Sequence, residues 1–450
     1  MSSSSPAAPS GASIVPSSIN RDILRLAIPA LAAFVGQPLF LIADAAIVGH
    51  LGPDALAGMS LASTILQTVI GLMIVLSFTT TAMVARHVGA GNLRLAVSSG
   101  IDGLWVAAIA GVVLIALGIV AIDWAIGLTN AEPEVATHAV SYMRWSLPGI
   151  PAMLITMAST GILRGLQDTK TTLYITVAGF TLNIGLNVLL VYGIDMGIAG
   201  SALGTSLAEA SMAIVFVTLI LRVARREGAS LRPDWANIRG ASVSGGWLLL
   251  RTASLRISLL ATVLVASSLG TEPLAAHQIL MTIFTTLAFA LDSLAVAGQA
   301  LTGKELGAGN RAVVRGIANR LMQWGIGFGV ITGLGLLLLG SWIAPLFTSD
   351  RAVQEAFRDG AIVLALMQPL AGFVFVLDGV LIGAGDSKYL AIAGAINLVI
   401  YLPILWLTHL IGDHGLIWLW VSFAFGYMGA RALTLGVRAR TDAWMRFGTR

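Results

Sequence analysis

The sequence predicts an all-α integral membrane protein with twelve transmembrane helices in two six-helix lobes, related by a pseudo-two-fold axis along the membrane normal. Three observations support this fold class: an apolar composition, twelve apolar segments of membrane-spanning length, and an internal repeat. Of the 450 residues, 57% are hydrophobic and only 11% are charged. A soluble domain carries about 25% charged residues, so this chain has too few to cover a water-facing surface.

The apolar segments are each long enough to cross a bilayer as a helix. They lie at roughly residues 26–48, 57–84, 101–122, 138–160, 171–193, 197–221, 243–269, 274–300, 320–345, 360–382, 389–411 and 415–437. Each half of the chain therefore contains six spans, and both halves enter the membrane in the same sense. This arrangement predicts two side-by-side bundles with a cleft between them.

The chain repeats itself at a single offset of 218 residues. The segment His50–Gly58 aligns with Ser268–Ala276, and Val88–Asn92 ("VGAGN") aligns with Leu306–Asn310 ("LGAGN"). The same register pairs Leu128 with Leu346, Glu132 with Asp350, Val135 with Val353, Pro151 with Pro369, and Gly161–Asp168 with Gly379–Asp386. Four spaced anchors in one register indicate a duplication. A membrane protein built from two such halves is most often a secondary transporter with its substrate site between the repeats.

The Lys and Arg residues predict the orientation in the membrane. They gather before the first span, after spans 2, 4, 8 and 10, in the central linker and at the end of the chain, whereas the opposite loops are mainly acidic. We therefore expect a multi-pass protein of a bacterial plasma membrane with both termini in the cytoplasm. The net charge of +4 reflects this topology, and we expect no nucleic-acid partner.

The predicted domains follow from the spans. They are a disordered cytoplasmic tail at 1–20, an N-terminal lobe at 21–221, a cytoplasmic linker at 222–242, a C-terminal lobe at 243–440 and a cytoplasmic tail at 441–450. The first 20 residues have almost no large apolar side chains and lack the pattern of a signal peptide.

Two kinds of connector are expected between the spans. In "VGAGN" and "LGAGN", between spans 2 and 3 and spans 8 and 9, Gly is expected to end a helix in the left-handed conformation. Asp168 and Asp386 each precede a helix start and are expected to cap it or to form a turn.

Asp44 is the most informative polar residue within a span. A carboxylate at membrane depth is costly, and its span contains no Lys or Arg after Arg25. Gln37 precedes it by two helical turns, so both project from the same face. Pro29 and Pro38 interrupt the backbone hydrogen bonding of this helix and allow a bend. Asp44 is therefore a candidate for proton exchange, the alternative being an acid that snorkels to water near the outer interface.

Asn183 and Asn187 form a second group in span 5, where their i,i+4 spacing places both amides on one face. Thr205 in span 6 could join them. Such residues also supply hydrogen bonds between helices in membranes, and by residue type alone this structural role is the favoured interpretation.

The second half carries acids and cations within its spans. Asp292 lies in span 8, Asp378 in span 10, and Arg251 and Arg256 in span 7, five residues apart and so poorly placed to share a face. A structural Asp–Arg pair is favoured over a transport role for these four residues, because pairing makes their burial tolerable. The repeat places Thr262 at the position equivalent to Asp44, so any coupling site is asymmetric.

The chain resembles the multidrug and toxic compound extrusion (MATE) family, in the branch called DNA-damage-inducible protein F. The resemblance covers residues 20 to 440 and rests on the order and spacing of several stretches. They are "RLAIPALAAFVGQPLFLIADAAIVGHLG", "VARHVGAGN", "GILRGLQDTKTTL", "LAAHQI", "GKELGAGN" and "DGVLIGAGD". It implies twelve helices in two lobes that open as a V and export organic cations in exchange for H⁺ or Na⁺.

The resemblance also implies roles for individual residues. Asp44 matches the acid implicated in proton coupling, Pro29 the proline at which the first helix is thought to bend, and Gln37, Asn183 and Thr205 match positions lining the same cavity. Related members often carry a second acid at the position of Asn187, which cannot titrate, so about one proton per cycle is expected. Na⁺-type members place acids in the second lobe, where Asp378 matches one position.

We therefore expect a proton-coupled antiporter for small organic cations or amphipathic drugs, working as a monomer in the lipid bilayer without a cofactor or metal. Arg251 and Arg256 disfavour a Na⁺ site by repulsion. The main alternative is a lipid-precursor flippase with the same two-lobe plan, whose pyrophosphate Arg251, Arg256 and Arg431 would have to bind. The six His residues are scattered and the chain has no Cys, which disfavours an enzyme. A channel is disfavoured by the duplication within one chain.

Overall fold

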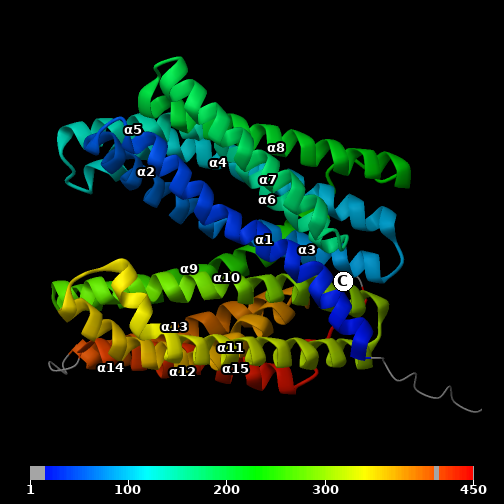
Figure 1. Ribbon diagram of the computed structural model, residues 1–450. Coiled ribbons are helices and arrows are strands. Elements are labelled where there is room, and N and C mark those ends of the chain that lie inside the picture. Colours follow the sequence, from blue (N-terminus) through cyan, green and yellow to red (C-terminus); the bar gives the residue numbers. More distant parts are fainter. Residues whose placement is uncertain (1–15, 410–414, 449–450) are drawn as a thin grey trace, which may run out of the picture.

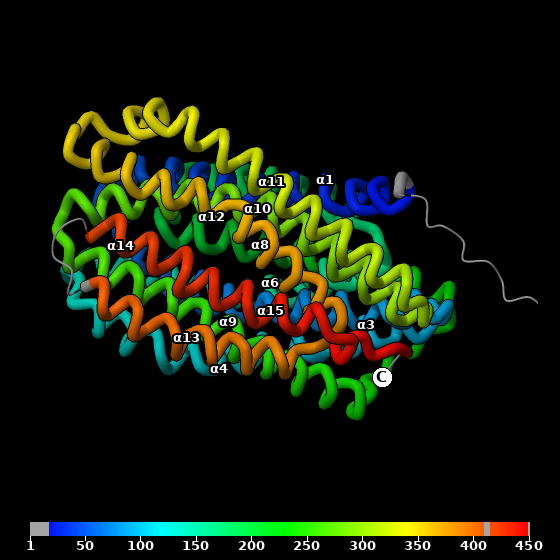
Figure 2. Tube along the Cα trace, turned by 90° about the horizontal axis from the view of Figure 1, so that it is seen from below, coloured from blue at the N-terminus to red at the C-terminus, as the bar shows by residue number. Residues whose placement is uncertain are grey.

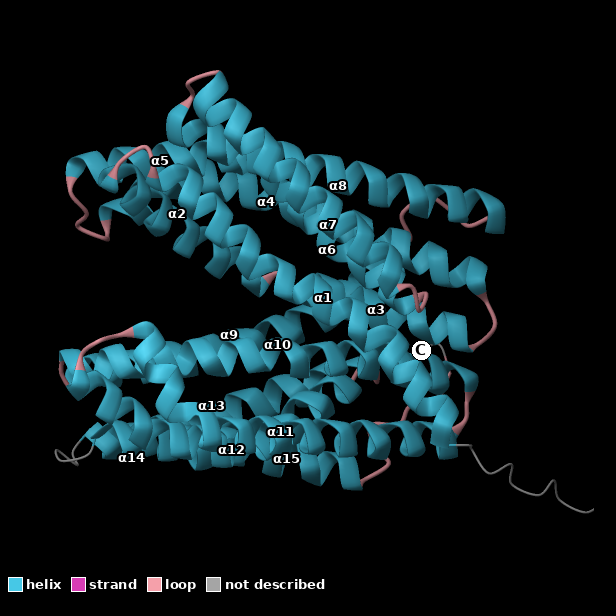
Figure 3. Ribbon diagram, viewed as in Figure 1, coloured by secondary structure: helices cyan, strands magenta, loops and turns pink. Residues whose placement is uncertain are grey.

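A computed structural model describes residues 16–409 and 415–448 of the chain, and within these ranges the fold is all-helical (Figure 3). Twelve helical stretches are long and apolar enough to cross a membrane, which confirms the predicted number of spans. The protein is therefore a multi-pass membrane protein. Its helices form an N-lobe, residues 16–227, and a C-lobe, residues 235–448 (Figure 1).

The N-lobe helices are α1 (Pro16–Gly49), α2 (Pro53–Leu72), α3 (Val75–Gly89), α4 (Leu93–Gly127), α5 (Pro133–Ser146), α6 (Ile150–Gly165), α7 (Thr169–Val188) and α8 (Gly197–Glu227). The C-lobe helices are α9 (Trp235–Ser268), α10 (Thr271–Ala308), α11 (Arg311–Phe347), α12 (Arg351–Gly383), α13 (Ser387–His409), α14 (Gly415–Val421) and α15 (Ala430–Arg440). Helical turns at Leu147–Gly149, Leu189–Gly193 and Ser422–Gly429 complete the fourth, fifth and twelfth spans.

The helices extend beyond the apolar segments that predicted them. α1 begins at Pro16, so residues 16–20 of the predicted tail at 1–20 are helical, and residues 1–15 lie outside the described chain. The predicted linker at 222–242 is also mainly helical, because α8 continues to Glu227 and α9 begins at Trp235. Charged and polar turns at helix ends carry no hydropathy signal, although they propagate the same backbone hydrogen bonds.

The linker between α8 and α9 (residues 228–234) is hydrogen-bonded to α4. The carboxylate of Asp102 accepts hydrogen bonds from the backbone N–H of Asp234 at 2.9 Å and from Nδ2 of Asn237 at 3.2 Å. Asp234 in turn caps α9 by accepting from the N–H groups of residues 236 and 237. The first residues of the C-lobe are therefore held by the N-lobe.

The two lobes meet along α1, α3 and α10. Their ribbons lie close together at the end of the molecule where α1 begins and α15 ends, and they diverge toward the opposite end (Figure 1). Figure 2 looks at the C-lobe from the side turned away from the N-lobe and shows α12 between α11 and α15.

Two glycines that are equivalent in the internal repeat lie at this contact between the lobes. A Cβ atom on Gly89 of α3 would overlap the backbone oxygen of Lys304, and one on Gly307 of α10 would overlap the backbone oxygen of Arg86. The offset of 218 residues relates Gly89 to Gly307 and Arg86 to Lys304, so the two contacts are equivalent by symmetry. Such reciprocal contacts occur at a two-fold axis. The pseudo-two-fold axis therefore passes between α3 and α10, where only glycine permits the approach.

The glycines predicted to end helices are confirmed in both halves, and the predicted cap is confirmed at Asp168. Gly91 and Gly309 adopt positive φ angles of 73° and 78° and end α3 and α10. The side chains of Asn92 and Asn310 then cap α4 and α11. Asp168 caps α7 by accepting from the Thr171 N–H at 3.0 Å, and Asp386 forms an ion pair with Arg438.

The segment after α15 is folded against the protein as far as residue 448. Trp444 is 1% exposed, the Gly448 N–H donates to the Leu306 carbonyl at 3.2 Å, and Nη1 of Arg86 donates to the Gly448 carbonyl at 3.3 Å. Residues 441–448 of the predicted tail at 441–450 therefore pack on the C-lobe, and Gly448 reaches Arg86 of the N-lobe. A single buried Trp in a polar stretch gives too weak a periodic signal to predict this.

Candidate functional site

Asp44 is buried within the N-lobe, at a point where α1, α7 and α8 meet. Its Oδ1 accepts hydrogen bonds from Nδ2 of Asn187 at 2.8 Å and from Oγ of Ser201 at 2.7 Å. Tyr142, on α5, also interacts with this carboxylate. The residue is only 5% exposed, so its carboxylate is removed from bulk solvent and surrounded by neutral donors.

The polar residues predicted on span 5 and span 6 join this carboxylate in one chain of hydrogen bonds. Nδ2 of Asn187 also donates to Oδ1 of Asn183 at 3.0 Å, and Nδ2 of Asn183 donates to Oγ1 of Thr205 at 3.0 Å. The i,i+4 spacing of the two amides therefore aligns them as predicted. The chain of contacts begins at Asp44 on α1 and ends on α8.

Two predicted residues of α1 lie outside this network. Gln37 is exposed and makes no hydrogen bond to a residue in the described ranges, although it precedes Asp44 by two helical turns. Pro29 lies within α1, which continues as a helix through both of its prolines in this conformation.

Three further N-lobe residues were not predicted. Ser201 and Tyr142 contact Asp44, but neither side chain carries the charge that marks a residue as exceptional within an apolar span. Glu209 on α8 interacts with Thr156. The sequence does contain a signal for Glu209, because an acid in an apolar span is a candidate functional residue for the same reason as Asp44.

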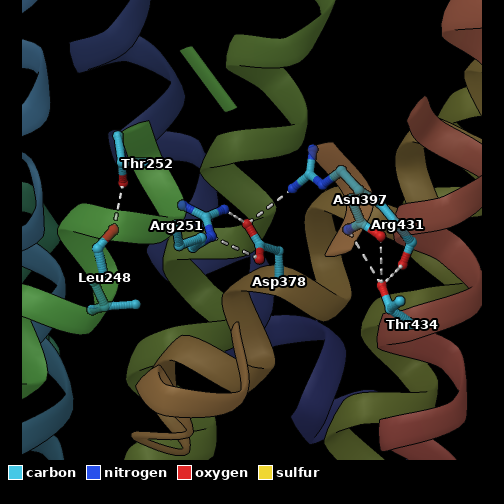
Figure 4. A network of polar contacts seen from close by, with 7 residues as sticks. All are labelled: Leu248, Arg251, Thr252, Asp378, Asn397, Arg431 and Thr434. Atoms are coloured by element: carbon cyan, nitrogen blue, oxygen red, sulfur yellow. Dashed lines mark hydrogen bonds and ion pairs between the residues drawn. The ribbon is translucent and has the colours of Figure 1, made fainter. Parts of the chain in front are cut away.

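The C-lobe contains the predicted ion pair in a larger form (Figure 4). Asp378 on α12 pairs with two arginines: Nε of Arg251 on α9 lies 3.2 Å from Oδ1, and Nη2 of Arg431 on α15 lies 3.2 Å from Oδ2. Arg251 makes a second contact to Asp378 through Nη2. Arg431 also lies over the rings of Phe375 and Tyr427.

The other two C-lobe candidates do not join this ion pair. Arg256 is exposed, five residues after Arg251, and its guanidinium approaches Gly71 on α2 of the opposite lobe. Asp292 on α10 interacts electrostatically with Arg251, Arg431 and Arg164 and forms no ion pair among the described residues.

Arg164, one of the basic residues expected to follow span 4, lies inside the N-lobe instead. It lies on α6, is 7% exposed, and its Nη1 is 3.4 Å from Oγ of Ser77. The guanidinium also lies over the ring of Phe34. It is therefore a buried interior cation, because α6 extends to Gly165, beyond the predicted end of its span.

Two homologous helical lobes with charged side chains held inside them define a membrane transport protein of the secondary-transporter class. The comparison with protein families identifies it further. The MatE family model matches residues 29–189 and 249–407, once in each lobe. The chain therefore belongs to the MatE family.

Several relatives align along most of the chain. DNA damage-inducible protein F of Escherichia coli is 27% identical over 430 residues, which are 93% of this chain and 91% of that protein. Protein DETOXIFICATION 43 of Arabidopsis thaliana is 31% identical over 320 residues, 69% and 58% of the two chains. The probable multidrug resistance protein NorM of Thermotoga maritima is 26% identical over 379 residues, 82% and 81% of the two chains.

Solved structures share the fold. A MATE transporter of Vibrio cholerae in a bent form matches with a TM-score of 0.86 at 21% identity, covering 95% of this chain and 99% of that one. A MOP superfamily transporter from Pyrococcus furiosus matches with a TM-score of 0.85 at 22% identity, covering 95% and 96%. These matches confirm the twelve-helix architecture in two lobes.

Proposed function

We propose that this protein is an efflux transporter for hydrophobic organic cations and amphipathic drugs, driven by proton antiport, with Asp44 as the coupling carboxylate. The environment of Asp44 carries the proposal: a buried acid inside an apolar bundle, held by neutral donors and paired with no cation in the described chain. Membrane-embedded acids of this kind mark ion pathways and proton relays. The relative named as a probable multidrug resistance protein supports the substrate class.

Protonation would change the hydrogen bonds that Asp44 can make. The carboxylate accepts from Asn187 and Ser201, whereas a carboxylic acid must also donate. The side-chain oxygen of Asn187 is buried beside it without a partner among the described residues, so an acceptor is available after rearrangement. The two protonation states would thus favour different arrangements of α1 and α7, which is what coupling to a conformational change requires.

The conformational change would use α1 as the moving element. Pro29 removes one backbone donor from this helix, so a bend there breaks fewer hydrogen bonds than elsewhere. Bending would narrow the proposed substrate site at Gln37, Asn183, Asn187 and Thr205 and expel the substrate outward. The lobes would then expose the site alternately to the two sides by rocking about the α3–α10 contact, with both termini in the cytoplasm of a bacterial cell and the transporter acting as a monomer.

The contacts of Asp378 favour H⁺ over Na⁺ as the coupling ion. Both of its carboxylate oxygens already bind arginines, so a sodium ion would have to displace Arg251 or Arg431 and then experience their repulsion. The same pairing weakens the flippase alternative, since these arginines are partly neutralised before any pyrophosphate arrives. Asp292, near the same arginines, is the remaining C-lobe candidate for coupling.

The experiment is proton flux in proteoliposomes on addition of an organic cation, comparing wild type with Asp44→Asn. The wild type should release protons when the cation is added. In Asp44→Asn the proton flux should be at least about tenfold lower, while the protein remains folded. Asp123→Asn is the matched control, because Asp123 forms an exposed pair with Arg144. Flux that survives in Asp44→Asn would exclude Asp44 and direct attention to Asp292.

A further inference from the structure

A cavity of about 360 Å³ is lined by residues of α11, α12 and α15 in the C-lobe. Figure 2 shows these three helices from the side of the C-lobe turned away from the N-lobe. This volume is within the range of about 300–1,000 Å³ in which proteins hold small ligands. The cavity is separate from the Asp378 ion pair and from Asp44, none of whose residues line it. The proposed transport function therefore does not use it.

Most of the cavity wall is apolar. Phe373, Leu377 and Leu381 of α12 form part of it, and Leu433 and Val437 of α15 lie at its edge. Leu433 and Val437 are 68% and 53% exposed on a membrane-spanning helix, so the edge is accessible to the hydrocarbon of the bilayer. An acyl chain entering from the bilayer can occupy such a groove without crossing water.

One end of the same cavity is polar and positively charged. Arg315, in the second turn of α11, and Arg440, the last residue of α15, both line it. Asp442 pairs with Arg315 and Arg311 together, so this group retains one positive charge, and Arg440 adds a second because it forms no ion pair within the described chain. The charged end coincides with the ends of two membrane spans, the depth at which lipid headgroups lie.

A second observation at this end also indicates a ligand. Trp444 lines the cavity and is 1% exposed, and its indole Nε1–H has no hydrogen-bond acceptor among the described residues. A buried donor without a partner is unfavourable unless a bound group satisfies it. A phosphodiester oxygen is a strong acceptor, and the single negative charge of the phosphodiester would neutralise one of the two excess charges.

We propose that this cavity binds an anionic phospholipid of the leaflet at which α1 begins and α15 ends. The headgroup phosphate contacts Arg440, Arg315 and the Trp444 indole, and one acyl chain lies along α12 between α11 and α15. Basic pockets between transmembrane helices, with apolar walls below them, select anionic lipid headgroups in this way. A soluble anion would use the charges but would leave the apolar groove empty.

The test is native mass spectrometry of the full-length protein in mild detergent, with phosphatidylglycerol or phosphatidylcholine of the same acyl chains. Wild type should retain phosphatidylglycerol preferentially, and Arg440→Gln should weaken that retention about fivefold. Arg239→Gln is the matched control, since Arg239 is an exposed arginine of α9 that does not line the cavity, and it should change nothing. Ala432→Phe, which fills the apolar part, should reduce the retention of both lipids.

Three results would overturn the proposal. The first is equal retention of the two lipids by wild type, and the second is an equal loss in Arg440→Gln and Arg239→Gln. The third is displacement of phosphatidylglycerol by millimolar glycerol 3-phosphate, which would identify a site for soluble phosphates that needs no acyl chain. Because Arg440 is exposed at a helix end, Arg440→Gln should fold normally, and unchanged thermal unfolding in detergent verifies this.

Discussion

The two lobes hold their principal acids in opposite ways. Asp44 in the N-lobe is surrounded by an amide and hydroxyl groups, whereas Asp378 in the C-lobe is held between two arginines. At the position equivalent to Asp44, the C-lobe has Thr262, whose hydroxyl is hydrogen-bonded to that of Tyr401 at 2.7 Å. An acid among neutral donors can gain a proton without leaving a charge unpaired, while an acid between cations cannot. The same helical scaffold therefore supports a proposed titrating site in one lobe and a fixed charge cluster in the other.

The largest expected difference is in stability. Asp378→Asn leaves Arg251 and Arg431 buried without a carboxylate, and we expect the free energy of unfolding to fall by about 3–5 kcal/mol. Asp44→Asn should change it by no more than about 1 kcal/mol, because an amide can still accept from Asn187 and Ser201. Unfolding in detergent, followed by tryptophan fluorescence, measures both. Equal losses for the two variants would contradict the contrast between the lobes.

The second prediction concerns the contact between α3 and α10, where the two lobes contribute equivalent glycines. Gly89→Ala and Gly307→Ala each place a methyl group on the backbone of the opposite helix, and each should lower stability by about 1–3 kcal/mol. The two losses should be equal, unlike those of the two acids. Gly316→Ala on α11 is the control, because nothing lies near its Cβ position, and it should stabilise the helix by up to about 1 kcal/mol. Unequal losses would show that the contact is not symmetric.

A smaller effect is expected from Ser201. Ser201→Ala removes one of the donors to Asp44 and leaves Asn187 in place, a change of about 1 kcal/mol in the interaction with the carboxylate. Proton flux driven by an organic cation should therefore fall by roughly fivefold and not disappear. Ser211→Ala, whose hydroxyl bonds only the preceding turn of the same helix, should be neutral. Complete loss of flux would give Ser201 a direct part in proton transfer.

The smallest effect is expected for Arg256. Arg256→Gln removes an exposed cation that forms no ion pair with a described residue, so stability should change by no more than about 0.5 kcal/mol. Arg251→Gln, on the same helix, deprives Asp378 of its bidentate partner. It should lower the free energy of unfolding about as much as Asp378→Asn does. The same unfolding measurement separates the two variants, and a large loss of stability for Arg256→Gln would contradict this prediction.

Much of the architecture follows from local signals in the sequence. The number of spans depends on hydropathy summed over each helix, so the sequence predicts it correctly. The observed helices begin and end at other residues than the predicted spans. The caps at Asn92, Asn310 and Asp168 follow from residue type, and at Asn92 and Asn310 also from the glycine that precedes each. The i,i+4 spacing of Asn183 and Asn187 requires only that span 5 be a helix.

The remaining features depend on contacts between residues far apart in the chain. Ser201 reaches Asp44 across 157 residues, and Arg251 reaches Asp378 across 127. Nothing in the local sequence distinguishes Ser201 from other serines in apolar helices, or Arg251 from Arg256. Likewise "VGAGN" and "LGAGN" indicate helix ends, but only the packing of α3 on α10 shows that Gly89 and Gly307 lie at the symmetry axis.

The sequence by itself therefore determined the class of protein, the number of spans, the duplication and the acid of the first helix, because each depends on composition, periodicity or a repeated register. The tertiary structure decided which donors surround that acid, which arginines neutralise Asp378, and where the two halves touch. The physical reason is that hydropathy and capping act within a few helical turns, whereas the environment of a buried charge is assembled from helices that the chain brings together only on folding.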